Sequence, residues 1–239
     1  MPKRGYGFTF KGIKSDDMGM WMIWMPEIPQ PARMGKYENV PGRDGTLWVD
    51  DGGYESIKLK VPCITKPGAD FGAICKWLSG AGDLIFDMDA GYSRRARITM
   101  EYAAKYTQPR SNVREFQVNF ECQPFRYQHP APTLTVTNMQ AVLNPGNVTS
   151  EPIFIITGSG DINLLVGTTA VLITALSGKI AINSEAMMAY DPDNLSISKN
   201  ASVYLASSDE WPKLPPGNTY VQWTGNATKV EVKPQWRWM

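Results

Sequence analysis

The chain has 239 residues and a mass of 26.6 kDa, carries a formal net charge of +1, and is 43% hydrophobic. That is enough apolar material for the core of one large domain or of two ordinary ones. A charge near zero gives no reason to expect a polyanionic partner, so nucleic-acid specificity is not predicted. No segment approaches the ~20 apolar residues of a membrane-spanning helix, so we expect no membrane insertion.

The apolar run at 18–25 is the one segment that resembles a secretion signal. It is short for the apolar region of a signal peptide, and Asp16 and Asp17 stand directly before it. We therefore interpret it as a buried strand and expect synthesis in the cytoplasm.

Three cysteines and one histidine limit the possible chemistry. Cys63, Cys75 and Cys122 show no CxxC spacing, which argues against a disulfide framework and against a zinc site. We expect them to be small buried hydrophobes. His129 lies alone in a proline-rich stretch, so one chain has no histidine triad and no multi-histidine metal site. The sequence nominates no metal and no cofactor.

The first half of the chain predicts a β-rich domain. Strands are predicted at 5–10, where aromatic and small residues alternate, at 18–25, an apolar run, and at 83–88, 94–106 and 116–122. Turn residues at 50–53 predict a hairpin loop that joins strands at 46–49 and 57–61. The prolines at 26, 29 and 31 predict an extended segment that needs a partner surface.

One segment has helical periodicity. Phe71, Ile74, Cys75 and Leu78 fall at positions i, i+3, i+4 and i+7, which predicts a helix over 69–78. The stretch Ser79-Gly80-Ala81-Gly82 predicts its stop.

The second half predicts an all-β domain of short strands. The candidates are 134–137, 153–157, 162–166, 170–174, 179–182, 195–198, 203–206, 220–224 and 229–232. This number and spacing favour a β-sandwich. The stretch 144–160 begins with a turn, enters a strand at Pro152 and closes with a turn at 158–160, so we interpret it as a seam between two β-rich domains. Prolines at 124, 130 and 132 predict a linker, which gives domains 1–132 and 133–239.

Three functional classes stay open from the residues alone. Trp211 and Trp223 are candidates for a sugar-stacking platform, although buried core tryptophans are more common. Paired carboxylates of a cell-wall hydrolase can lie far apart in sequence, but nothing nominates a pair, so catalysis is not predicted. A structural role in an assembly is the third class.

Seven short motifs, in order along nearly the whole chain, resemble those of the distal tail (Dit) proteins of long-tailed, non-contractile bacteriophages. They are Phe8-x-Phe10-x-Gly12, Val40-x-Gly42-Arg43-Asp44-Gly45, Trp77-Leu78-x-Gly80, Val118-x-Phe120-x-Cys122-x-Pro124, Asn144-x-Gly146 followed by Ser150, Pro152, Ile156 and Gly158, Pro212-x-Leu214-x-x-Gly217-Asn218, and Lys233-Pro234-x-Trp236-Arg237.

The resemblance implies a mainly β protein with two parts. The first is an N-terminal, tail-tube-like domain with one helix and long hairpins that assembles into a homo-hexameric ring. The second is a galectin-like C-terminal β-sandwich. The resemblance further implies contacts with the tail tube protein and with a tail-associated lysin or fibre protein, and receptor-binding proteins as further partners. The location it implies is the tail tip of a virion assembled in the bacterial cytoplasm.

A galectin-type sugar site resembles a cluster of His, Asn and Arg with a stacking Trp. Residues 133–239 contain no histidine and one arginine, Arg237, so we expect the sandwich to lack that chemistry. Host cell-wall polysaccharide binding through the tryptophans remains the alternative function.

A ring predicts subunit-interface residues. We expect Arg43 and Asp44 to contact an adjacent subunit, and the hairpin around Gly91 to overlap a neighbour through Arg94, Arg95 and Arg97. A solvated turn and a solvated charged strand are the competing interpretation.

Overall fold

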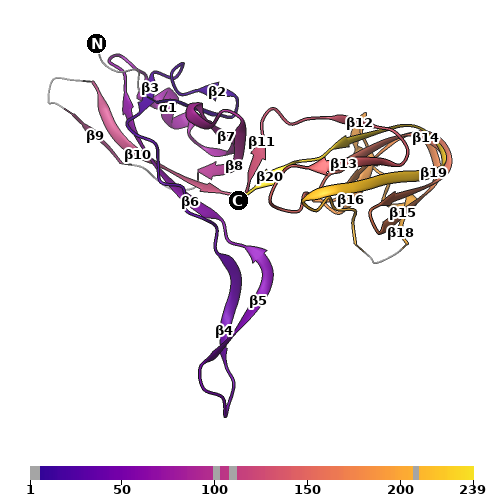
Figure 1. The fold of residues 1–239 in the computed structure, drawn as a ribbon. Helices are drawn as coiled ribbons and strands as arrows, with labels where there is room; N and C mark the ends of the chain where they lie inside the picture. The colour runs from indigo at the N-terminus through magenta and orange to yellow at the C-terminus, as the bar shows by residue number, and fades with distance from the viewer. Residues whose placement is uncertain (1–5, 99–102, 108–111, 207–209) are drawn as a thin grey trace. The chain divides into compact units, whose positions relative to one another are not determined.

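The computed structural model describes residues 6–98, 103–107, 112–206 and 210–239. Within these ranges strands predominate, with one α-helix, which confirms the predicted mainly-β class. The chain divides into two compact units (Figure 1): unit 1 is Met1–Arg126 with Met239, and unit 2 is Tyr127–Trp238. No helix among the described residues is long and apolar enough to cross a membrane.

Unit 1 is built on an antiparallel sheet with strand order β2-β1-β7-β8-β10-β6-β3, and β9 pairs with β10. Its strands are β1 (Phe8–Phe10), β2 (Ile13–Lys14), β3 (Met20–Met22), β6 (Ile57–Thr65), β7 (Gly80–Phe86), β8 (Tyr92–Ile98), β9 (Ala104–Tyr106) and β10 (Arg114–Cys122). A short 3₁₀ turn, η1 (Asp87–Asp89), joins β7 to β8. The predicted strand at 94–106 is covered by β8 and β9, and its residues 99–102 lie outside the described residues.

Alternation in β6 and β10 arises because one face of each strand enters the core. Phe116, Val118, Phe120 and Cys122 are buried and their neighbours are not, as the sequence predicts. The same pattern in β6 places Leu59, Val61 and Cys63 in this core.

The predicted helix is present as α1 (Phe71–Trp77). The Asp70 carboxylate caps it by accepting hydrogen bonds from the Gly72 and Ala73 amides, at 2.9 and 3.2 Å. The Trp77 indole N–H donates to the Phe10 carbonyl at 3.1 Å, which fixes the helix to β1. The helix ends at Trp77, before the predicted stop at 79–82, and β7 begins at Gly80.

The predicted hairpin loop at 50–53 is wrong. Residues 50–53 lie inside β5 (Thr46–Tyr54), which pairs with β4 (Arg33–Asn39) and not with β6. The turn of this hairpin is at 40–45, and β6 pairs with β10 and β3 instead. We call the β4–β5 hairpin the ribbon.

Unit 2 contains a curled antiparallel sheet with strand order β12-β19-β14-β15-β16-β17, in which β13 also pairs with β19 and β18 with β15. The strands are β12 (Leu134–Val136), β13 (Gln140–Asn144), β14 (Ile153–Val166), β15 (Thr169–Asn183), β16 (Met188–Asp191), β17 (Asn194–Ser198), β18 (Val203–Leu205) and β19 (Gly217–Lys233). The 3₁₀ turn η2 (Asn200–Ser202) precedes β18, and β11 (Arg126–Gln128) pairs with β20 (Arg237–Trp238). The inward faces enclose a second core, which includes Phe154, Ile180 and Trp236.

Three predicted pairs of short strands are in fact three long, continuous strands. β14, β15 and β19 have 14, 15 and 17 residues and run through the predicted turns, including 158–160. The glycines form bulges that bend the strands, since the pairing register shifts between Gly160 and Ile162. At Gly225, where φ is +95°, a Cβ would lie 2.2 Å from the Asp161 carbonyl oxygen, so only glycine fits.

The predicted seam at 144–160 is also wrong. β13 ends at Asn144 and pairs with β19, the same strand that pairs with β14. Both sides of the stretch therefore belong to one sheet.

Candidate binding surfaces

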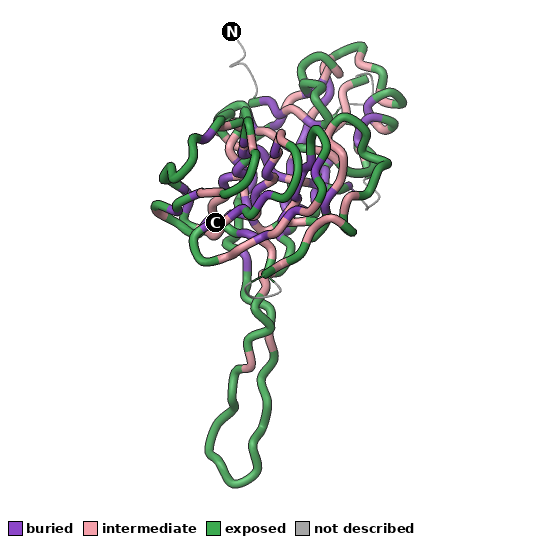
Figure 2. Tube along the Cα trace, turned by 90° about the vertical axis from the view of Figure 1, so that its right-hand side faces the viewer, coloured by how far each residue is buried: buried purple, intermediate pink, exposed green. Residues whose placement is uncertain are grey.

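The ribbon is a two-stranded sheet of its own, with mostly exposed residues (Figure 2). Tyr37 and Trp48 are opposite each other in register, and their ring centroids lie 4.8 Å apart. Tyr37 is nevertheless 71% exposed and Trp48 40% exposed. Met34, Val40 and Leu47 are further exposed apolar residues of the same hairpin. The ribbon therefore presents an apolar surface that the rest of unit 1 does not cover.

The base of the ribbon is held by polar and aromatic contacts. The Arg33 guanidinium lies over the Tyr54 ring at 4.5 Å and 3.7 Å from the Asp50 carboxylate. Tyr54 in turn packs edge to face on Phe125, with 5.3 Å between ring centroids. These contacts fix the base of the ribbon, and the part beyond the base does not pack against the described core of unit 1.

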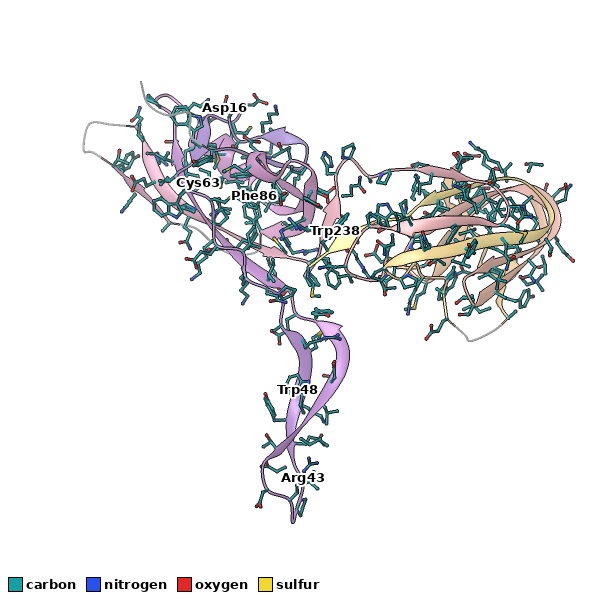
Figure 3. All side chains as sticks on the ribbon, viewed as in Figure 1. Asp16, Arg43, Trp48, Cys63, Phe86 and Trp238 are labelled. Atoms are coloured by element: carbon teal, nitrogen blue, oxygen red, sulfur yellow. The ribbon has the colours of Figure 1, made fainter. Side chains whose placement is uncertain are left out.

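Arg43 and Asp44 lie in the turn of the ribbon, and both are exposed (Figure 3 labels Arg43 and Trp48). The Arg43 amide donates to the Val40 carbonyl at 3.2 Å, which closes the turn. Gly42 and Gly45 flank the pair with φ near +80°. The sequence thus placed these two candidates in a turn correctly, and the structure adds that the turn ends a long hairpin.

The arginines of β8 face in two directions. Arg94 is 8% exposed, and burial lowers the pKa of its guanidinium. Arg95 and Arg97 lie on the opposite face of the strand and are more exposed. Gly91 is exposed in the turn before β8. The four candidates are therefore not one surface, because Arg94 points into unit 1.

Arg95 and Arg97 line a cleft of about 550 Å³ together with acidic residues of the neighbouring strands. Asp83 of β7 is opposite Arg95 in register, and Glu121 of β10 is opposite Arg97. Glu121 also accepts a hydrogen bond from the Ser56 hydroxyl at 3.0 Å. Alternating charges of this kind suit a polar contact with another protein rather than binding of a polyanion.

Unit 2 carries a larger cleft of about 770 Å³, which we call the unit 2 cleft. Its lining comes from four places: part of the segment before β19 (Glu210, Trp211, Lys213 and Pro215), residues 166–169 around the β14–β15 turn, residues 218–220 and Gln222 of β19, and the single residues Met139 and Thr149. Trp211 lines it, and so does Tyr220, which is 62% exposed. Trp223 does not line it, because its side chain packs against the core of unit 2. The two tryptophans named from the sequence are not brought together.

A buried polar network holds one wall of this cleft. The Asn144 side chain donates to the Leu214 carbonyl at 2.8 Å and accepts from the Gly146 amide at 2.8 Å. The Leu214 and Ser150 amide and carbonyl groups bond to each other in both directions, at 2.8 and 2.9 Å. These bonds fix the backbone of the segment that carries Trp211.

Arg237 extends this network to the segment between β13 and β14. Its Nε donates to the Thr149 carbonyl at 2.6 Å, and its NH1 bonds the Glu151 carboxylate at 2.9 Å. The Ser150 hydroxyl donates to the Pro234 carbonyl. The lone arginine of this half thus has a structural role that no local sequence signal predicts.

The cysteines carry no site. Cys63 and Cys122 are buried, Cys75 is partly exposed, and all three are free thiols. Burial raises the pKa of Cys122 to about 12 and also raises that of Cys63, which keeps both thiols neutral. Among the described residues, no group of three or more His, Cys, Asp or Glu side chains could hold a metal ion.

Comparison with known proteins gives similarity of structure only. No protein-family model matches the chain, and no curated protein sequence matches it. The solved structure of the Dit protein of phage SPP1, described as a paradigm of the hub adsorption apparatus in phages that infect Gram-positive bacteria, is similar with a TM-score of 0.72 and 14% identity. The similarity covers 96% of this chain and 98% of that one.

A chain of the phage p2 baseplate in its activated conformation is similar with a TM-score of 0.50 and 7% identity, over 96% of both chains. The resemblance inferred from the sequence motifs is confirmed at the level of structure. Over nearly its whole length, this chain has the fold of a phage distal tail protein.

Proposed function

We propose that this chain is a structural subunit of a phage tail tip, a homo-hexameric hub that joins the tail tube to the host-adsorption apparatus. The fold likeness to SPP1 Dit supports a tail-hub role. The observation that carries the proposal furthest is the ribbon, a long exposed hairpin with apolar side chains that its own unit does not cover.

The ribbon calls for a partner surface. A two-stranded hairpin alone is marginal in water, and this one exposes two aromatic rings. A second copy of the chain is a natural cover, because a contact from one copy to the next closes into a ring when the rotation permits. Arg43 and Asp44 in the turn then reach an adjacent subunit, and the Arg95 and Arg97 cleft offers a polar contact.

The remaining partners follow from the same role. A hub has a tail tube protein on one side and a tail-associated lysin or fibre protein on the other, with receptor-binding proteins at its periphery. It needs no cofactor and no catalysis. Its place is the virion tail tip, after assembly in the host cytoplasm.

The mass of the purified chain tests this proposal. Light scattering over a concentration series is expected to reach about six times 26.6 kDa, with rings in electron micrographs. A clean monomer at high concentration, without rings, would overturn the proposal.

Charge reversal tests the arginine cleft separately. Arg95→Glu places a like charge opposite Asp83 and is expected to weaken assembly, whereas Lys233→Glu, the same charge change on unit 2, is expected to leave it intact. Thermal melting confirms that both variants are folded. Full assembly of Arg95→Glu would remove this cleft from the interface.

A further inference from the structure

The unit 2 cleft presents two aromatic rings from different elements. Trp211 packs on one side against the core of unit 2, so its ring is held in place. Tyr220 stands on the outward face of β19, where neighbouring residues alternate between buried and exposed. Rings of this kind offer apolar faces to a ligand at low entropic cost, because few rotatable bonds are fixed on binding.

Polar side chains surround these rings. Asn218 and Gln222 share the outward face of β19 with Tyr220, and Thr168 lies in the β14–β15 turn. Within the described part of the chain, the side chains of Asn218 and Gln222 make no hydrogen bond to protein. Their amide groups are therefore available as both donors and acceptors.

The charge of the lining is balanced. Among the lining residues that the structure describes, Glu210 and Lys213 are the charged ones, one of each sign. A phosphate-rich polymer would call for an excess of cations, which this cleft does not have. The lining suits a neutral ligand with many hydroxyl groups.

The cleft is also formed in advance of binding. The bonds of Leu214 to Asn144 and Ser150 fix the segment that bears Trp211, and Arg237 fixes Thr149, the residue before Ser150. Little ordering is left for a ligand to impose.

From these observations we infer that the unit 2 cleft binds a neutral oligosaccharide. Sugar C–H groups lie against Trp211 and Tyr220, and sugar hydroxyls bond to Asn218 and Gln222. Trp223 has no part in this site. The inference concerns unit 2 by itself and does not depend on ring formation.

Saturation-transfer NMR with the full chain tests it. The probes are four- to six-residue oligomers of glucose, galactose, rhamnose and N-acetylglucosamine, each at ~1 mM, the range of weak binding. Glycerol-phosphate teichoic acid is the charged comparison. At least one neutral probe is expected to receive transfer at its ring protons.

Matched tyrosine variants locate the site. Tyr220→Ala is expected to weaken binding at least tenfold, and Tyr204→Ala, which removes a tyrosine that is 55% exposed on β18, is expected to leave it unchanged. Trp211→Ala is expected to abolish binding, provided that melting shows this variant to be folded. If the Trp211→Ala variant does not fold, the binding measured with Tyr220→Ala tests the site instead. Transfer to no neutral probe, transfer only to teichoic acid, or full binding by Tyr220→Ala would each overturn the inference.

Discussion

Removing the aromatic pair of the ribbon should break the assembly and spare the fold. In Tyr37→Ser with Trp48→Ser, the two rings lost are 71% and 40% exposed in the single chain. With aromatic side chains of roughly 150–250 Å² each, about 240 Å² is left for a neighbour to cover. At about 25 cal/mol per Å², that area is worth at most ~6 kcal/mol per interface. If half is covered, about 3 kcal/mol is lost, or roughly 100-fold in affinity.

The fold of unit 1 should survive, because β4 and β5 pair only with each other. Loss of the contact between the rings should lower the free energy of unfolding by about 1 kcal/mol, which shifts Tm by only a few degrees. Sedimentation velocity across concentrations gives the assembly state, and circular dichroism melting gives the fold. Tyr204→Ser with Leu195→Ser, both exposed on unit 2, is the matched control. If the ribbon variant assembles at the same concentrations as the unmodified chain, the ribbon is not the interface.

Three further predictions concern stability and reactivity. Gly225→Ala should destabilise unit 2 by more than ~3 kcal/mol in denaturant melts, because the added Cβ has no space. Gly178→Ala, at a position with φ of +87° and open space, should cost only ~1–2 kcal/mol of unfolding free energy. Equal losses in the two variants would contradict the bulge geometry. Asn144→Ala should cost ~2–4 kcal/mol by leaving buried groups unpaired, which an unchanged denaturation midpoint would disprove. Alkylation of the native protein at pH 8, followed by mass spectrometry, should label Cys75 well before Cys122. Burial raises the pKa of Cys122 from 9.0 to about 12, so the stability that comes from keeping this thiol neutral is fully present below pH 9.0 and is lost as the pH rises toward about 12. Equal labelling of the two cysteines would disprove the burial of Cys122.

Elements that serve a core were predictable from the sequence. In β10 the alternation of Phe116 to Cys122 reflects one buried face, and in α1 the spacing of Ile74 and Leu78 reflects one helical face. In each case the same burial that requires apolar residues at regular spacing also stabilises the element.

The errors have a physical cause as well. Residues 50–53 carry turn-forming residue types, yet they lie in a strand that no core covers, so nothing forces alternation there. Gly160 has φ of +75°, which suits a turn or a bulge equally well, and only its pairing with Leu176 on β15 decides between them.

The unit 2 cleft could not be predicted from the sequence, for a related reason. Its lining joins segments from Met139 to Gln222, and Tyr220 carries no local signal that separates it from other exposed tyrosines. Trp211 was named from the sequence as an aromatic candidate. Tyr220 is a second lining residue, and only the path of the segment before β19 shows that it shares a cleft with Trp211.

The bonds of Ser150 to Pro234 and of Thr149 to Arg237 set an order of events during synthesis. The segment before β14 leaves the ribosome long before the residues that secure it. Until those later residues arrive, residues 149–150 have only the earlier bonds of Ser150 to Leu214 to hold them. A chain that stopped a few residues short of Pro234 would therefore contain most of the strands but lack two of the bonds that secure this wall.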